Sequence, residues 1–337
     1  MKTTRIVLAS RPAGMPQQEN FRTETAELPP LEPGHALLQT LYLSLDPYMR
    51  GRMSDAPSYA PPVAVDETMC GATVSRVLES ADPELHPGDF VLGYAGWQTH
   101  SVEQGRYLRK LDPTAAPLTT ALGVLGMPGF TAYSGLLTIG RPQPGETVVV
   151  AAATGPVGAT VGQIAKIKGA RAVGIAGGPR KVALLTEKFG FDAAIDHRAP
   201  DFAEQLAAAT PGGIDVYFEN VGGAVLDAVL PRLNKFARIP VCGLVASYND
   251  TALPAGPDRM GLLMSLILRK SLTLRGFIQT EFLDQFGQFY PEVTGWLADG
   301  RLTYLEDVVD GLDHTVEAFQ GLLTGKNLGK LVIKVAD

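Results

Sequence analysis

Residues 147–168 read TVVVAAATGPVGATVGQIAKIK, and this stretch decides the fold class. Its first part, Thr147 to Ala152, is a continuous apolar run, which is typical of a strand buried in a parallel sheet. A glycine-containing loop follows, and the apolar spacing from Val157 to Lys168 predicts a helix. A buried strand that leads through such a loop into a helix is the first unit of a doubly wound α/β sheet.

The same alternation of strand and helix continues along the chain. Short β-type runs alternate with amphipathic segments, which predicts a parallel sheet with helices on both faces. We expect strands at residues 172–176, 193–196 and 214–218, and a helix at residues 181–188.

The flanking regions have a different pattern. Between residues 6 and 111, short β-type runs are separated by turns such as Pro33-Gly34 and Pro87-Gly88, so we expect a strand-rich, barrel-like unit. The last apolar run, residues 331–335, is also strand-like. We expect it to rejoin the N-terminal unit.

Length and composition limit the possible functions. A chain of 337 residues is long enough for about two domains, each with its own core. The formal net charge of −6, without a long basic run, makes nucleic acid an unlikely partner class. No run of about 18 apolar residues occurs, so we expect no membrane association. With Cys70 and Cys242 as the two cysteines, we expect a cytoplasmic protein.

The loop Ala153-Thr154-Gly155-Pro156-Val157-Gly158 is an AxGxxG variant of the phosphate-binding loop of dinucleotide enzymes. Its place between a buried strand and a helix is the context that this motif requires. Gly155 would let the backbone approach a pyrophosphate, and Gly158 would let the helix pack closely on the strand. Pro156 and Val157 open the helix, whose N-terminus favours an anion.

The end of the second strand favours NADP over NAD. An NAD site usually has an acidic residue about 20 residues after the loop, but residues 176–181 read AGGPRK and contain no carboxylate. Arg180 and Lys181, joined by His197 and Arg198, could pair with a 2′-phosphate. The alternative is an ordinary solvated helix start, although cations at that position oppose the helix dipole.

The residues do not indicate a metal site. Cys70, Cys242 and the five histidines lack the spacing that a zinc site needs. Cys242 precedes Gly243 at a strand end, where a cysteine is more often a small buried hydrophobe than a nucleophile. No nucleophile elbow or P-loop points to hydrolysis or phosphoryl transfer. A metal-free hydride-transfer enzyme is the hypothesis that remains.

Several longer stretches carry a family resemblance. They lie in order from one end of the chain to the other: LSLDPYMR at residues 43–50, GYAGWQ at 93–98, GMPGFTAY at 126–133, VGQIAK at 161–166, ENVGG at 219–223 and NLGK at 327–330. With these stretches the chain resembles the zinc-independent medium-chain dehydrogenases/reductases, the group that includes prostaglandin reductases and bacterial NADP-dependent double-bond reductases.

The resemblance implies a split GroES-like catalytic domain and an inserted Rossmann domain. The expected bounds are residues 1–120, completed by 302–337, for the first domain and 121–301 for the second. It also implies homodimers. In the family, the counterparts of Gly155 to Gly158 hold the pyrophosphate and that of Lys181 holds the 2′-phosphate. Further counterparts line the rest of the cofactor, namely Thr131, Asn220, Cys242, Gly243, Phe277 and Asn327. His197 stands where relatives often have a tyrosine.

The resemblance also implies a reaction, in which an α,β-unsaturated ketone or aldehyde accepts a hydride at its β-carbon and becomes an enolate. A hydrogen-bond donor near the enolate oxygen would stabilise this charge. The family counterpart of Tyr248 approaches the substrate carbonyl, so Tyr248 is our first candidate for that donor. Tyr48 is a second candidate, for positioning the substrate. Arg50 is close to Tyr48 in the sequence, but it could have a structural role and pair with a carboxylate such as Asp46.

Two other functions stay open. A quinone reductase would share the zinc-free architecture and NADPH, but would deliver the hydride to a quinone. A non-catalytic NADPH-binding sensor would keep the cofactor loop without turnover. An intact cofactor site is expected in all three cases, so activity measurements discriminate them.

Overall fold

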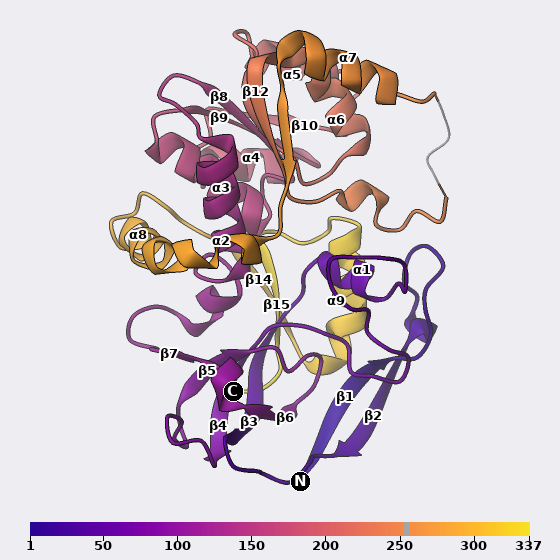
Figure 1. The fold of residues 1–337 in the computed structure, drawn as a ribbon, viewed down its shortest axis with the longest axis vertical. Coiled ribbons are helices and arrows are strands. Elements are labelled where there is room, and N and C mark those ends of the chain that lie inside the picture. The colour runs from indigo at the N-terminus through magenta and orange to yellow at the C-terminus, as the bar shows by residue number, and fades with distance from the viewer. Residues whose placement is uncertain (253–256) are drawn as a thin grey trace. The chain divides into compact units, whose positions relative to one another are not determined.

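Two sheets of different kinds dominate the computed structural model, which describes residues 1–252 and 257–337. The chain divides into one unit of residues 1–122 and 306–337 and a second unit of residues 123–305 (Figure 1). We refer to them as the barrel unit and the Rossmann unit.

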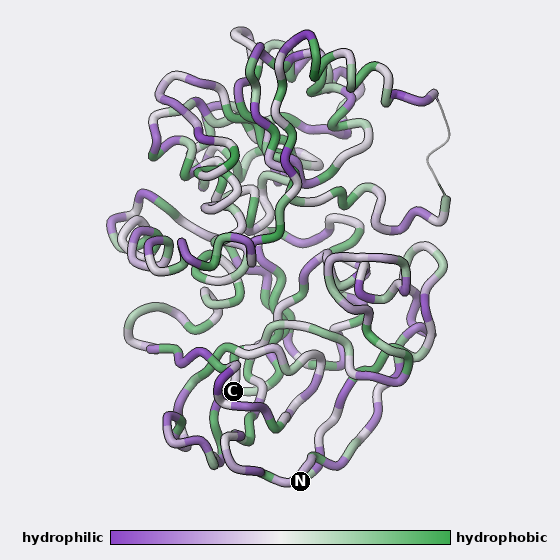
Figure 2. Tube along the Cα trace, in the orientation of Figure 1, coloured by the Kyte–Doolittle hydropathy of each residue, from purple (hydrophilic) through white to green (hydrophobic). Residues whose placement is uncertain are grey.

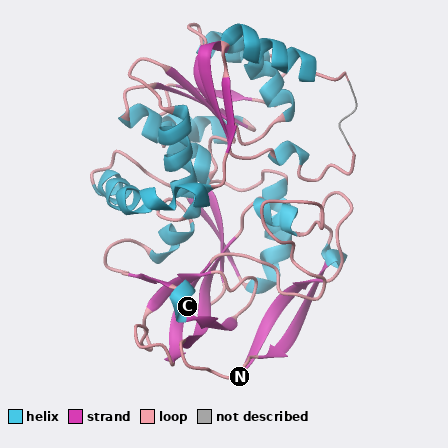
Figure 3. Cartoon of the chain, viewed as in Figure 1, coloured by secondary structure: helices cyan, strands magenta, loops and turns pink. Residues whose placement is uncertain are grey.

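The Rossmann unit contains a six-stranded parallel sheet in the order β10-β9-β8-β11-β12-β13 (Figure 3). Counted along the chain from β8, this is the 3-2-1-4-5-6 order of a dinucleotide-binding fold. The predicted doubly wound sheet is therefore confirmed. The strands are β8 (Thr147–Ala151), β9 (Arg171–Ala176), β10 (Ala193–Asp196), β11 (Ile214–Phe218), β12 (Leu233–Val241) and β13 (Thr273–Gly276).

Helices cover both faces of this sheet. One core cluster joins the sheet to apolar residues of α5, α6 and α7, including Leu206, Val229 and Leu266. The opposite face carries α3 and α4, where Leu185 and Phe191 pack over Gly174 of β9. The helices of this unit are α2 (Met127–Ser134), α3 (Pro156–Ile167), α4 (Pro179–Glu187), α5 (Phe202–Ala209), α6 (Gly223–Val229), α7 (Met260–Lys270) and α8 (Phe286–Ala298).

The start of α4 differs from the sequence expectation. The helix begins at Pro179 rather than at Lys181. Proline is favoured in the first turn of a helix because its missing N–H would have no intrahelical partner there. Gly178 precedes it with a φ of 92°, a backbone conformation that suits glycine.

The barrel unit is built mainly from antiparallel strands. Its main sheet has the order β14-β15-β3-β4-β5-β7, with β6 also paired to β3, while β1 and β2 form a separate ribbon. The C-terminal strand rejoins this unit as expected, because β15 pairs with β3 through Val332 opposite Ser44. The elements are β1 (Lys2–Leu8), β2 (Phe21–Glu27), β3 (His35–Ser44), α1 (Tyr48–Arg52), β4 (Thr73–Ser80), β5 (Phe90–Gly93), β6 (His100–Gln104), β7 (Arg109–Leu111), β14 (Glu306–Asp310), α9 (Thr315–Leu323) and β15 (Lys330–Lys334).

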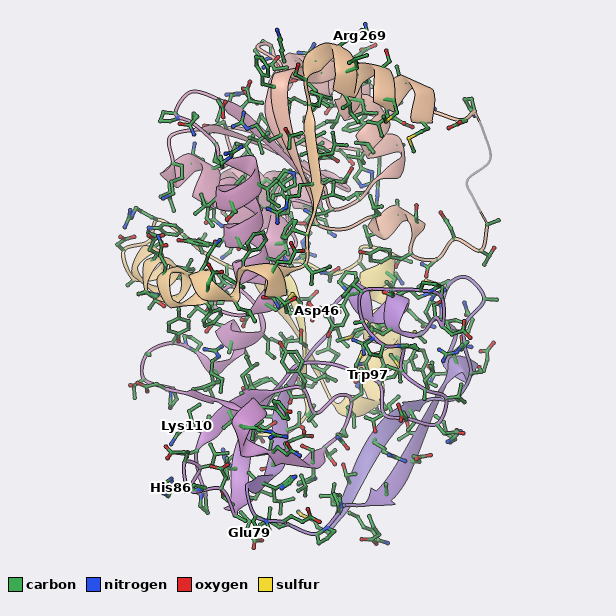
Figure 4. All side chains as sticks on the ribbon, viewed as in Figure 1. Asp46, Glu79, His86, Trp97, Lys110 and Arg269 are labelled. Carbon is green, nitrogen blue, oxygen red and sulfur yellow. The ribbon has the colours of Figure 1, made fainter. Side chains whose placement is uncertain are left out.

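Trp97, which is labelled in Figure 4, is at the centre of the barrel unit's core. Its ring stacks on Phe21 at 5.5 Å and meets the edge of Phe319 at the same centroid distance. Phe319 belongs to α9, so the C-terminal segment supplies part of the core around an N-terminal tryptophan. The preceding Gly96 has a φ of 80°, and a Cβ there would lie 2.3 Å from the Met69 carbonyl oxygen, so only glycine fits.

Among the helices of residues 1–252 and 257–337, none is long and apolar enough to cross a membrane.

Candidate functional site

The loop between β8 and α3 has the close packing that its glycines predict. A Cβ on Gly158 would lie 2.5 Å from the carbonyl oxygen of Ala152 and 2.7 Å from the Cα of Ala153. Ala152 itself has a φ of 51°, which turns the chain out of the strand. Gly158 is therefore required for the first turn of α3 to lie against the end of β8.

Gly155 is the N-cap residue of α3, and Pro156 is the first helical residue. A Cβ on Gly155 would lie 3.3 Å from the Ala152 oxygen, so this position is less crowded than Gly158. The first N–H groups of any α-helix have no intrahelical acceptor, and the helix dipole adds positive potential there. This loop therefore fits the pyrophosphate of a dinucleotide.

Cationic side chains surround the end of β9. A Cβ on Gly177 would lie 2.8 Å from Nε of Arg198 and 2.9 Å from Nε2 of His197, so both side chains pass over this glycine. Lys181 lies close enough to His197 for its positive charge to lower the pKa of the imidazole. Arg180 is exposed on the first turn of α4. This donor set suits a 2′-phosphate.

The expectation that no carboxylate lies at this strand end was incomplete. Asp196 at the end of β10 reaches this loop, and its Oδ1 accepts hydrogen bonds from the N–H groups of Gly178 and Arg198, both at 2.9 Å. These bonds lower the pKa of Asp196 against the effect of its desolvation. Asp196 lies on the neighbouring strand and this oxygen holds the turn, so residues 176–181 alone give no sign of it.

Glu219, which had no expected role, joins the ends of β11 and β12. Its Oε1 accepts hydrogen bonds from the Tyr217 hydroxyl at 3.0 Å, from Val221 N–H at 2.6 Å and from Gly222 N–H at 2.9 Å. Burial raises the pKa of this carboxyl group. A charged residue directly after a buried apolar strand was the signal available in the sequence.

The backbone of the same segment connects three neighbouring strands. The Glu219 carbonyl oxygen accepts hydrogen bonds from the N–H groups of Cys242 and Gly243, which follow β12. The Asn220 side chain donates from Nδ2 to the carbonyl oxygen of Ala151 at 2.9 Å, at the end of β8. The ends of β8, β11 and β12 are thereby tied together at the edge of the sheet that carries the phosphate loop.

Tyr248 lies next to these strand ends. A Cβ on Gly243 would be 3.0 Å from the Tyr248 hydroxyl oxygen and 3.5 Å from the Asn220 carbonyl oxygen. The absence of a side chain on Gly243 therefore makes room for the Tyr248 hydroxyl. The side chain of Tyr248 is only partly buried, so this hydroxyl is placed where a ligand could meet it.

Cys242 is half-buried rather than buried as its sequence context indicates, and its thiol is desolvated. Burial, together with the nearby Glu219 carboxyl, raises the pKa of the thiol to about 12. A thiol with such a pKa carries almost no thiolate at neutral pH and is a poor nucleophile.

Thr131 and Phe277 both lie in the packed interior of the Rossmann unit. Thr131 on α2 donates its hydroxyl hydrogen to the Met127 carbonyl oxygen at 2.8 Å, which leaves its oxygen lone pairs for another partner. The Phe277 ring packs edge-on against Phe218 at 6.1 Å and lies over Gly135. Its side chain is therefore core, and only its backbone is available to line a ligand.

The structure places the other predicted site residues, Tyr48 and Asn327, in the barrel unit. Tyr48 is the first residue of α1, and burial raises the pKa of its phenol. Asn327 donates from Nδ2 to the Gly329 carbonyl oxygen at 2.8 Å, which fixes the loop before β15.

The pairing suggested for Arg50 was wrong. Asp46, labelled in Figure 4, instead bonds through Oδ1 to Nζ of Lys330 at 2.6 Å, and Lys330 also donates to the Leu45 carbonyl oxygen at 2.7 Å. Both charged side chains are buried. Arg50 donates to the Gly14 carbonyl oxygen, with Nη2 at 2.8 Å. The LDPYMR and NLGK stretches therefore meet through a buried ion pair that their separation of nearly the whole chain conceals in the sequence.

Metal-ligating groups do not gather in the described part of the chain. In residues 1–252 and 257–337, no three or more His, Cys, Asp or Glu side chains are arranged to hold a metal ion.

Comparisons with known proteins place the chain in a family. The model described as "N-terminal domain of oxidoreductase" matches residues 4–111, and the model described as "Zinc-binding dehydrogenase" matches residues 156–297. The NADPH-dependent curcumin reductase of Escherichia coli is 57% identical over 336 residues, which cover 99% of this chain and 97% of the relative. The chain belongs to the zinc-independent medium-chain dehydrogenases/reductases.

Other members of this family match along almost the whole chain. Prostaglandin reductase 1 of Rattus norvegicus is 41% identical over 326 residues, covering 95% of both chains. The crystal structure of CurA from Vibrio vulnificus in complex with NADPH matches with a TM-score of 0.96 at 52% identity and covers 99% of each chain. The medium-chain fold, with a GroES-like and a Rossmann domain, is thus confirmed.

Proposed function

We propose that this protein catalyses the NADPH-dependent reduction of the C=C bond of α,β-unsaturated ketones and aldehydes. The observation that carries the proposal is the Tyr248 hydroxyl beside Gly243, next to the strand ends that the Glu219 carbonyl and the Asn220 side chain tie to the end of β8. Similarity to a curcumin reductase and to a prostaglandin reductase over nearly the whole chain supports the same reaction class.

The residues of the Rossmann unit fit NADPH. The Gly155 to Gly158 loop would hold the pyrophosphate at the start of α3, and Lys181, Arg180 and His197 would bind the 2′-phosphate. The same cofactor is present in the crystal structure of CurA from Vibrio vulnificus.

The nicotinamide end would meet a second group of residues. We assign to it Asn220, Cys242 and Gly243 at the ends of β11 and β12, with Thr131 of α2 and the backbone of Phe277. In the barrel unit, Asn327 completes the set by the family resemblance.

Bound NADPH supplies a hydride to the β-carbon of the enone, and the residues of this chain stabilise the charge that results. The Tyr248 hydroxyl donates a hydrogen bond to the substrate oxygen, which becomes an enolate oxygen, and a proton from water then adds to the α-carbon and restores the ketone. Such a donor stabilises the transition state because it is already oriented when the charge develops. Tyr48, whose phenol stays protonated because burial raises its pKa, positions the substrate in the barrel unit.

A direct assay tests the reaction class. Purified protein is mixed with NADPH and a medium-chain enone, and the loss of reduced-nicotinamide absorbance is followed with NADPH, with NADH and with a chelator present. Chelator-resistant turnover that prefers NADPH and yields the saturated ketone is the expected result. Turnover of quinones without turnover of enones would replace the proposal with a quinone reductase, and NADPH binding without any turnover would indicate a sensor.

We also propose that the protein works as a homodimer in the cytoplasm. β13 is an edge strand of the parallel sheet. The neighbouring helix α7 is largely hydrophobic (Figure 2) and leaves Leu268 81% exposed, with Met260, Leu262 and Met264 each more than half exposed. Unpaired strand edges and exposed apolar patches are typical of protein interfaces. The two free cysteines fit a reducing compartment.

Light scattering coupled to gel filtration tests the dimer. We expect twice the chain mass for the wild type and a shift to the monomer for Leu268→Glu. Lys188→Glu, at the exposed end of α4, is the control. A wild-type monomer at all concentrations would refute the dimer.

A further inference from the structure

The side chain of Glu219 folds the loop after β11 around one of its own oxygens. Oε1 accepts hydrogen bonds from the N–H groups of Val221 and Gly222 at 2.6 and 2.9 Å. The Tyr217 hydroxyl donates to the same oxygen at 3.0 Å. Glu219 is 1% exposed, so these bonds form away from water. The conformation of residues 219–222 therefore depends on a single buried acceptor atom.

The segment that carries Tyr248 is bonded to this loop along its length. We call residues 219–222 the template loop and residues 242–248 the Tyr248 loop. N–H groups of the Tyr248 loop donate to consecutive carbonyl oxygens of the template loop. The pairs are Cys242 and Gly243 to Glu219 at 2.9 and 3.2 Å, Val245 to Asn220 at 3.1 Å, and Ala246 to Val221 at 3.0 Å.

The two loops also pack closely at the glycines that end the template loop. A Cβ on Gly222 would lie 3.2 Å from Cδ2 of Leu244, and a Cβ on Gly223 would lie 3.5 Å from Cβ of Ala246. Gly222 has a φ of 77°, a conformation that suits glycine. The bond from the Gly222 N–H to Glu219 therefore holds the surface on which the Tyr248 loop lies.

Tyr248 follows this contact directly. Val245–Ser247 form a turn of 3₁₀ helix, and the Tyr248 N–H donates to the Val245 carbonyl oxygen at 3.4 Å. The Tyr248 hydroxyl returns to 3.0 Å from the position of a Cβ on Gly243. Gly243 and Val245 are both bonded to the template loop. The hydroxyl is therefore tied to the template loop at both ends of its path.

We infer that Glu219 is a positioning residue, which holds the Tyr248 hydroxyl at the substrate oxygen through the template loop. The inference rests on the proposed function for the role of that hydroxyl. The acceptor oxygen of Glu219 matters more than its charge, because in residues 1–252 and 257–337 the second oxygen, Oε2, is buried without a hydrogen-bond partner. A displacement of about 1 Å of a group that meets the substrate lowers a rate by up to about 100-fold.

Two variants separate the acceptor oxygen from the charge. Glu219→Gln keeps an oxygen that accepts from Val221 and Gly222, and its amide nitrogen replaces the oxygen without a partner. Glu219→Met fills the space but accepts no hydrogen bond. It is combined with Tyr217→Phe, because a buried hydroxyl without an acceptor would add a cost of its own. Tyr217→Phe alone is the reference for this double variant.

The turnover of a good enone is the first measurement. We expect Tyr217→Phe/Glu219→Met to lower kcat about 10- to 100-fold relative to Tyr217→Phe, with a much smaller change in KM. Glu219→Gln should restore kcat to within about threefold of the wild type. An equal loss of kcat in Glu219→Gln would show that the charge matters instead and would overturn the inference.

Asp215→Leu is the matched control. Asp215 lies near the start of β11, at the opposite end of the strand from Glu219, and its Oδ2 accepts a hydrogen bond from the Thr147 N–H at 2.8 Å. The control therefore removes a carboxylate that holds a backbone N–H in the same unit. It should lower the free energy of unfolding and leave kcat unchanged. A loss of kcat as large as that of the Glu219→Met variant would reduce the effect to general destabilisation and overturn the inference.

A double-mutant cycle shows whether Glu219 acts through Tyr248. In Tyr248→Phe there is no hydroxyl left to position. Adding Tyr217→Phe/Glu219→Met should then lower kcat by less than about threefold beyond the loss caused by Tyr248→Phe. If the two losses multiply instead, Glu219 acts independently of the hydroxyl and the inference is wrong.

Amide hydrogen exchange, followed by mass spectrometry, separates this inference from the proposed function. In Tyr217→Phe/Glu219→Met, exchange should become about tenfold faster or more in residues 219–223 and 242–248, and stay unchanged in residues 147–151 of β8. This result supports the link between Glu219 and the Tyr248 loop even if no enone is turned over. Unchanged exchange in the Tyr248 loop contradicts it even in an active enone reductase. Unprotected amides in both loops of the wild type would contradict it without any variant.

Discussion

Tyr248 is the residue on which the proposed chemistry depends most. Its hydroxyl oxygen lies 3.0 Å from the position that a Cβ on Gly243 would occupy. The position of this hydroxyl therefore depends on residue 243 having no side chain. We expect Tyr248→Phe to lower kcat about ten- to a thousandfold, because the loss of one oxyanion donor typically costs a few kcal/mol. Steady-state rates with a good enone measure the effect, and Tyr107→Phe, an exposed tyrosine, is the control. Unchanged kcat would remove Tyr248 from the mechanism.

Lys181 tests the cofactor assignment. It lies beside His197 at the end of β9, in the cationic group that we assign to the 2′-phosphate. We expect Lys181→Ala to weaken NADPH binding about tenfold or more, with little effect on NADH, because charge-assisted hydrogen bonds to phosphate contribute about 1.5–3 kcal/mol. Kd values for both cofactors, with Lys188→Ala as control, give the answer. Equal weakening of NADPH and NADH would contradict the assignment.

His197 gives this group a pH dependence. Partial desolvation and the charge of Arg198 lower the pKa of the imidazole, so at pH 7 the ring is mainly neutral without cofactor. A bound phosphate would favour the protonated ring and raise its pKa, so protons and NADPH should bind together. We therefore expect the preference for NADPH over NADH to increase as the pH falls below 7. His197→Asn should flatten that increase, and identical pH profiles for variant and wild type would contradict it.

At the scale of elements, the β8–α3 connection depends on Gly158. A Cβ there would meet the Ala152 carbonyl at 2.5 Å, whereas at Gly155 the same oxygen would be 3.3 Å away. We expect Gly158→Ala to reduce the free energy of unfolding by about 1–3 kcal/mol, as is typical of overpacking, and to weaken NADPH binding. Gly155→Ala should cost clearly less stability. Urea denaturation measures the free energy of unfolding of both variants. Equal losses in the two variants would contradict this packing.

The contact between β15 and the segment after β3 depends on the Lys330–Asp46 pair. Both groups are buried, and burial lowers the pKa of the Lys330 ammonium group. Lys330→Met leaves the carboxylate of Asp46 without its cation, so we expect a loss of about 3–5 kcal/mol in the free energy of unfolding. Adding Asp46→Asn should recover part of this loss. Chemical denaturation is the measurement, with the exposed Lys326→Met as control, and a loss no larger than the control's would contradict the structural role.

At the scale of the whole molecule, the sequence indicated the architecture well. Strands at residues 193–196 and 214–218 occur as expected, the first at the edge of the parallel sheet and the second buried inside it. The return of the C-terminal strand to the barrel unit followed from its apolar pattern. The β8–α3 loop was recognisable because its glycines have local roles.

Contacts between distant segments could not be predicted in the same way. The partner of Asp46 is Lys330, and nothing local distinguishes it from Arg50, which is only four residues away. Asp196 reaches the loop after β9 from a neighbouring strand. Glu219 was visible in the sequence, but its hydrogen bonds to Val221 and Gly222 exist only in the folded loop. The features that could not be predicted are therefore contacts that form only when the chain is folded.

The position at which the hydride arrives tests the central claim most directly. An enone is reduced with NADPH that carries deuterium at both C4 positions, and the product is analysed by mass spectrometry and NMR. We predict one deuterium at the β-carbon of a saturated ketone, with its carbonyl intact, and slower formation of this product by Tyr248→Phe. Deuterium on the former carbonyl carbon of an allylic alcohol, or no labelled product from any enone, would contradict it.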